Sequence, residues 1–127
     1  MVASPYSAAV RSAVVHEARL RFGEGADTAA PGGAVTVGLC GHWDHEGTCR
    51  WPHHCRVRED DGEHVLRVVV VAGDDERDAV RERVEAALGQ GQQTGPDGRT
   101  TTWTVVSSRT DGPQGSEVRL AERLENA

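Results

Sequence analysis

The sequence predicts an α+β fold: a small antiparallel or mixed sheet of about four strands, with one main helix packed on a face and a short C-terminal helix. Three observations predict it. Apolar residues alternate with a period of two near the start of the chain, β-branched residues form a run in its middle, and one later segment has the 3.6-residue period of a helix. The length of 127 residues suits one domain, so 1–127 is treated as a single domain.

The first half of the chain predicts two strands and a turn. Residues 1–13 are small and polar, and we expect a flexible lead-in. Every second residue is apolar toward the end of 14–22, which predicts a half-buried strand. Apolar residues alternate again over 34–40, which predicts a second strand. The sequence EDDGE at 59–63 predicts a turn.

The second half predicts a buried strand, a helix, another strand and a terminal helix. The run HVLRVVVVAG (64–73) is rich in β-branched residues and is expected in the middle of the sheet. Residues 74–89 begin with acidic residues, repeat apolar residues at helical spacing and end at a glycine. TTWTVVSS (101–108) predicts a strand, and 109–116 are expected to be flexible. Apolar residues between 118 and 124 favour a short terminal helix.

Composition narrows the function classes. The net charge is −6 and the pI is near 5.4, which disfavours a nucleic-acid-binding protein. No secretory signal or stretch long and apolar enough for a membrane span is visible, so we expect a cytoplasmic protein. In that compartment thiols stay reduced, and clustered cysteines favour metal binding over disulfides.

The segment 39–55, LCGHWDHEGTCRWPHHC, holds all three cysteines and four of the six histidines. Thiolate and imidazole are the groups that zinc prefers in proteins. The density of these groups therefore predicts a zinc-binding loop. The candidate ligands are Cys40, His42, His45, Cys49, His53 and Cys55.

Several ligand sets fit this spacing. Residues i and i+2 of a strand share a face, so Cys40 with His42, and His53 with Cys55, would form two pairs facing each other across a hairpin. Cys49 or His45 could replace one of these four ligands. His54 would point away from His53 and ranks lower.

Two other interpretations of the cysteines stay open. Cys40 could form a disulfide with Cys49 or with Cys55. Alternatively, the cysteines could be free and buried and the histidines unrelated to them. Within the zinc interpretation, a closed structural site that clips a small fold is favoured over an open catalytic site.

Residues 40–47, CGHWDHEG, resemble the HxHxDH signature of the metallo-β-lactamase-fold hydrolases, particularly the glyoxalase II type. The resemblance implies that His42, Asp44 and His45 would bind metal, and that Asp44 or Glu46 could accept a proton. Cys40 stands where the family has its first histidine. The family also needs histidines well downstream, and this chain has none after His64.

The sequence thus favours a small zinc-binding protein whose Cys/His loop stabilises the fold and presents an interaction surface. We expect a non-catalytic protein in preference to an enzyme. The alternatives are a metal-dependent hydrolase and a metal-handling or thiol redox sensor. The expected partner is an unidentified protein, with no nucleic acid and no membrane. Exposed sheet edges are also compatible with a homodimer.

Overall fold

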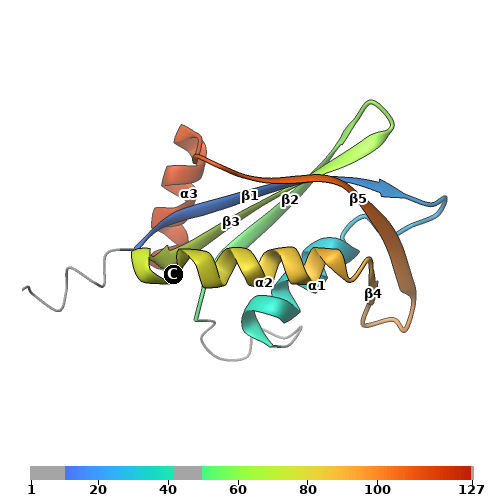
Figure 1. Cartoon of the computed structure of the whole chain (residues 1–127), viewed down its shortest axis with the longest axis horizontal. Helices are drawn as coiled ribbons and strands as arrows, with labels where there is room; N and C mark the ends of the chain where they lie inside the picture. Colours follow the sequence, from blue (N-terminus) through green and yellow to red (C-terminus); the bar gives the residue numbers. More distant parts are fainter. Residues whose placement is uncertain (1–10, 42–49, 127) are drawn as a thin grey trace, which may run out of the picture.

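The structure, a computed structural model, describes residues 11–41 and 50–126 and shows an α+β fold (Figure 1). Five antiparallel strands form one curled, half-barrel sheet in the order β2-β3-β1-β5-β4. The elements run along the chain as β1 (Arg11–Phe22), α1 (Ala30–Cys40), β2 (His53–Asp60), β3 (Glu63–Gly73), the 3-10 helix η2 (Asp74–Glu76), α2 (Arg77–Gly89), β4 (Gln92–Thr94), β5 (Thr100–Asp111) and α3 (Gly115–Glu125).

The four long strands and the first two α-helices follow the order β-α-β-β-α-β, with β4 and α3 added. The strand order β5-β1-β3-β2 within the sheet is that of the ferredoxin-like arrangement. The β2–β3 connection is the expected turn: Asp61 and Gly62 both have positive φ angles, of 52° and 78°. This backbone suits an Asp-Gly hairpin.

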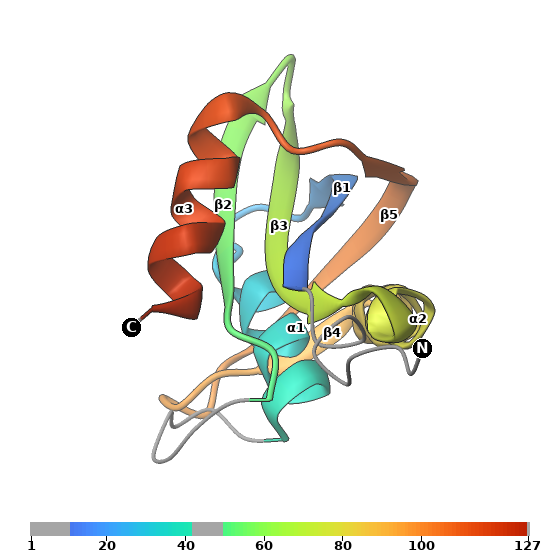
Figure 2. The same cartoon turned by 90° about the vertical axis from the view of Figure 1, so that its left-hand side faces the viewer.

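Helices cover both faces of the sheet (Figure 2), and a cluster of buried apolar residues lies on each face. Helices α1 and α2 pack together on one face, where the buried residues include Leu20 of β1, Leu66 of β3 and Val84 of α2. Helix α3 covers the other face at the β2 side, over a smaller cluster that contains Val69 and Ala121. Strand β3 is buried on both faces, as its run of β-branched residues predicted.

The prediction of a strand at 34–40 is wrong, because this segment belongs to helix α1. The alternation of Val35, Val37 and Leu39 suggested period two, but the buried residues of α1 follow a helical period. They are Ala30, Pro31, Gly33, Ala34, Val35 and Leu39. Pro31 in the first turn and Gly41 with φ 85° at the C-cap mark the two ends. The expected hairpin between 40–42 and 53–55 is therefore not formed by Cys40, which ends a helix.

The other expected elements are present with changed boundaries. The first strand begins at Arg11, inside the expected lead-in. Strand β5 continues to Asp111 and α3 begins at Gly115, so 109–116 consist mostly of regular structure. Strand β4 was missed within a glycine-rich connection, and β2 was missed beyond the possible hairpin arm at 53–55. None of the helices in 11–41 and 50–126 has the length and apolarity to cross a membrane.

Candidate functional site: the cleft between α1 and β2

A cleft of about 480 Å³ separates the N-terminal half of α1 from the edge strand β2. The side chains of β2 alternate in exposure, so His53, Cys55 and Val57 are partly buried toward α1. This confirms that His53 and Cys55 share a face. The cleft is lined by Thr28, Ala29, Gly32, Gly33, Thr36, His53, His54, Cys55 and Val57.

Gly32 allows α1 to lie close to β2. A Cβ atom at this position would be 3.2 Å from the Cβ of Cys55 and 3.7 Å from its Sγ. The first of these distances is shorter than an ordinary carbon–carbon contact. The small residues of α1 therefore set how closely the helix can approach the thiol of Cys55.

His53 is held by polar atoms at both ring nitrogens. Its Nδ1 lies 3.0 Å from the carbonyl oxygen of Trp51, and its Nε2 lies 3.0 Å from Oγ1 of Thr36. The Thr36 hydroxyl also lies 3.1 Å from the carbonyl oxygen of Gly32. A carbonyl can only accept, so Nδ1–H donates to Trp51 and Nε2 is the nitrogen left with a lone pair in the neutral ring. This pattern fixes a histidine tautomer in the same way as the outer contacts of metal-bound histidines.

Cys40 lies at the C-terminal end of α1, beside His53. The distance from Cys40 Sγ to His53 Nδ1 is 3.9 Å. Cys40 is disulfide-bonded, whereas Cys55 is a free cysteine. Of the two disulfides that the sequence left open, Cys40 with Cys55 is therefore not formed. The pairing of Cys40 with Cys49 involves a residue outside the described part of the chain.

The Cys55 thiol is protected by its surroundings. Desolvation by burial raises its pKa to about 12, so the thiol stays protonated near neutral pH. Its Sγ lies 4.0 Å from the carbonyl oxygen of Gly32, which is a weak contact.

Of the six expected metal ligands, the structure brings Cys40 and His53 together at the C-terminal end of α1, whereas Cys55 lies beside Gly32 near the other end of this helix. His42, His45 and Cys49 lie outside the described residues, as does Asp44 of the hydrolase-like motif. Within 11–41 and 50–126, no group of three or more Cys, His, Asp or Glu side chains is arranged to hold a metal ion. His54 is exposed on β2, as its lower rank as a ligand implied.

A polar pair that the sequence did not reveal lies elsewhere in the fold. His16 of β1 is 2% exposed, and its Nε2 lies 2.5 Å from Oγ of Ser108 on β5. Burial lowers the pKa of His16, so the ring is neutral at pH 7. The two residues are 92 positions apart, so no local motif could signal the contact. It ties β1 to β5.

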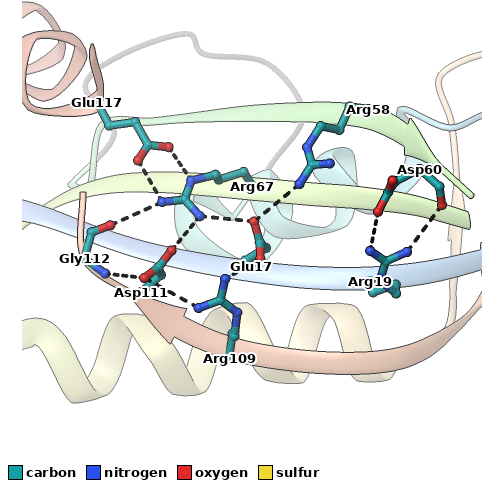
Figure 3. A network of polar contacts seen from close by, with 9 residues as sticks. All are labelled: Glu17, Arg19, Arg58, Asp60, Arg67, Arg109, Asp111, Gly112 and Glu117. Carbon is teal, nitrogen blue, oxygen red and sulfur yellow. Dashed lines mark hydrogen bonds and ion pairs between the residues drawn. The ribbon is translucent and has the colours of Figure 1, made fainter. Parts of the chain in front are cut away.

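A second network, on the face of the sheet that α3 covers, centres on Arg67 (Figure 3). Its guanidinium contacts the carboxylates of Glu117, Glu17 and Asp111 and the carbonyl oxygen of Gly112. The five contacts match the five N–H donors of an arginine. A fully satisfied, buried arginine is the mark of a structural network, not of a binding site.

Comparisons with known proteins leave the function open. No family model matches the chain, and no curated protein matches it. Among solved structures, the chain is similar to the crystal structure of an aminobenzoyl-glutamate utilization protein from Klebsiella pneumoniae, with 12% identity and a TM-score of 0.35. The match covers 86% of this chain but 31% of that one. Similarity at this level supports no argument about function.

Proposed function

We propose that this chain is a small, non-catalytic zinc-binding domain whose site is switched by the oxidation state of Cys40. The observation that carries the proposal is the position of a disulfide-bonded Cys40 with its Sγ 3.9 Å from Nδ1 of His53. The proposal combines two hypotheses from the sequence: a structural zinc site and a thiol redox sensor. Each describes one oxidation state of the same residues.

The distance between Cys40 and His53 suits a shared zinc ion. A tetrahedral ion with Zn–S near ~2.3 Å and Zn–N near ~2.0 Å holds its sulfur and nitrogen ligands about 3.5 Å apart. The separation of 3.9 Å is within a few tenths of that value. Binding by Nδ1 would require it to give up its proton and its contact with the Trp51 carbonyl.

The other ligands come from the same sequence segment. His42, His45 and Cys49 follow Cys40 within nine residues, and Cys55 shares a strand face with His53. Two ligands from this set would complete four. Burial opposes deprotonation of the Cys55 thiol. A bound zinc ion would favour it, because zinc binds the thiolate form.

Reduction of the disulfide makes the sulfur of Cys40 available as a metal ligand. Two thiol groups of a cellular reductant supply two electrons and two protons, which convert the disulfide of Cys40 into two thiols, and the two donor thiols become one new disulfide. The Cys40 thiol can then lose its proton and bind zinc as a thiolate. In the oxidised state this sulfur is bonded to another sulfur and provides no thiolate.

The proposal is tested by zinc affinity in matched variants of the reduced protein, measured by competition with a chromophoric chelator. Cys40→Ser and His53→Ala should each weaken zinc binding by at least about tenfold, because each removes one of four ligands. His54→Ala, the adjacent histidine on the exposed face of β2, is the control and should bind zinc normally. Unchanged affinity in both Cys40→Ser and His53→Ala would refute the site.

A further inference from the structure

Strand β2 has a second face, opposite the cysteine cleft, that carries positive charge. His54, Arg56 and Arg58 occupy alternate positions, so they point to the same side of the strand, and all three are exposed. Successive side chains on such a face are about 6.8 Å apart. Two arginines and a histidine in a row are unusual on a chain whose net charge is −6.

This face lies beside an open sheet edge. Strand β2 is the first strand in the order β2-β3-β1-β5-β4, and among the described residues it pairs with β3 alone. Its eight residues, His53–Asp60, therefore present one set of backbone N–H and C=O groups away from the sheet. Another extended chain can pair with such an edge.

A groove of about 280 Å³ lies between β2 and α3, which run side by side in Figure 2. Val69 and Leu120 contribute apolar surface to it, and Arg67 and Glu117 are already paired with each other. The groove is lined by His54, Arg56, Arg67, Val69, Ser116, Glu117, Leu120 and Arg123.

Two further arginines, Arg56 and Arg123, lie on the sides of this groove. Neither Arg56 nor Arg123 forms an ion pair with any residue in 11–41 and 50–126. Since the charge of Arg67 is balanced by its carboxylates, Arg56 and Arg123 leave the groove positive. A carboxylate brought there would gain charge-assisted hydrogen bonds.

We propose that the outer edge of β2, together with the groove against α3, binds an extended acidic segment of a partner protein. The segment would add a strand to the sheet through backbone hydrogen bonds. Acidic side chains at every second position would match the spacing of His54, Arg56 and Arg58, because both strands have the same rise per residue. This site uses the face of β2 opposite His53 and Cys55, so it does not depend on the proposed zinc site.

A second copy of this chain fits the edge less well than an acidic partner. In an antiparallel pair of β2 strands centred on Val57, Arg56 of each copy would lie opposite Arg58 of the other. Like charges directly opposite each other destabilise a strand pair. The charge pattern therefore favours a different chain with acidic residues.

Binding can be measured with a fluorescein-labelled peptide of alternating residues, Thr-Glu-Thr-Glu-Thr-Glu-Thr, by fluorescence anisotropy at low salt. Arg56→Glu should weaken binding by about tenfold or more. Arg99→Glu, an equal charge change at an exposed position near the β4–β5 turn, should change it less than about twofold. A peptide of the same composition with its glutamates contiguous should bind more weakly, and hydrogen exchange of the β2 amides should slow when the alternating peptide binds.

Three results would overturn the proposal. Equal weakening by Arg56→Glu and Arg99→Glu would mean that net charge alone attracts the peptide. Binding without slower exchange in 53–60 would exclude strand addition. Displacement of the peptide by inorganic phosphate, at matched ionic strength, would indicate a simple anion pocket.

Discussion

Arg67 of β3 and Glu117 of α3 form a two-pronged ion pair that fastens the terminal helix to the sheet. The Nε–Oε2 distance is 2.5 Å and the Nη2–Oε1 distance is 2.9 Å. The side chains are 7% and 5% exposed. Because Arg67 also contacts Glu17 and Asp111, one buried cation joins β1, β3, the end of β5 and α3.

Replacing Arg67 by Met should destabilise the protein by about 3–5 kcal/mol, because the buried carboxylate of Glu117 would lose its one ion-pair partner among the described residues. Arg109→Met is the matched control. Arg109 also pairs with Glu17 and Asp111, but its side chain is 60% exposed, so its loss should cost at most about 1 kcal/mol. Urea unfolding of the two variants measures the difference, and similar losses would show that Arg67 is not the organising charge.

Stability should fall on acidification through the same network. Hydrogen bonds from Arg67 lower the pKa of Glu117 and that of Asp111 below their ordinary values. The unfolded chain therefore binds protons at higher pH than the folded chain does, near pH ~4. The contribution is complete above that region and is lost as the pH falls through the lowered folded values.

Urea unfolding between about pH 7 and pH 3 tests this dependence. Glu117→Gln should flatten the acid-side slope, because the neutral amide does not titrate. Glu122→Gln, on the exposed side of the same helix, should leave the slope unchanged. Equal slopes in Glu117→Gln and the unmodified protein would contradict the assignment.

Cys55 should be nearly unreactive in the folded protein. With its pKa raised to about 12 from an ordinary value of 9.0, the thiolate fraction near pH 8 falls by about a thousandfold. Alkylation by iodoacetamide, followed by peptide mass spectrometry, should modify Cys55 slowly in the native protein and rapidly in urea. Rapid native modification would show that the cleft opens or that the thiol is ionised.

Gly38 should be sensitive to size because α1 and α2 approach each other closely there. A Cβ atom at Gly38 would lie 3.3 Å from the Cβ of Ala87 and 3.5 Å from the carbonyl oxygen of Arg83. Gly38→Val should therefore cost about 1–3 kcal/mol. At Gly89, where a Cβ meets nothing within 4 Å, Gly89→Ala should be neutral or stabilising in the same thermal-unfolding measurement.

Three of the five strands, β1, β3 and β5, could be predicted from the sequence because their signals are local. The β-branched run of β3, the Asp-Gly turn and the helical period of α2 each depend on neighbouring residues. Helix α1 could not be recognised in the same way, since β-branched Val35 and Val37 favour a strand locally. Burial of its small residues against α2 and β2 overrides that preference, and such packing is visible only after the chain folds.

The candidate site was anticipated in part. The grouping of cysteines and histidines pointed to 39–55, and the structure does place Cys40 beside His53. The helix that carries Cys40 and the disulfide depend on long-range packing. The contacts of Arg67 with Glu117 and of His16 with Ser108 span 50 and 92 positions, so no spacing rule could find them.

The most direct test of the account is the zinc content of the untagged protein in its two oxidation states, measured by native mass spectrometry. We expect one zinc ion per chain after reduction and none after disulfide formation, with the mass differing by two hydrogens in the metal-free forms. The loss should reverse when a thiol reductant and zinc are restored. Equal zinc content in both states, or no zinc in the reduced protein, would contradict a redox-switched zinc site at Cys40 and His53.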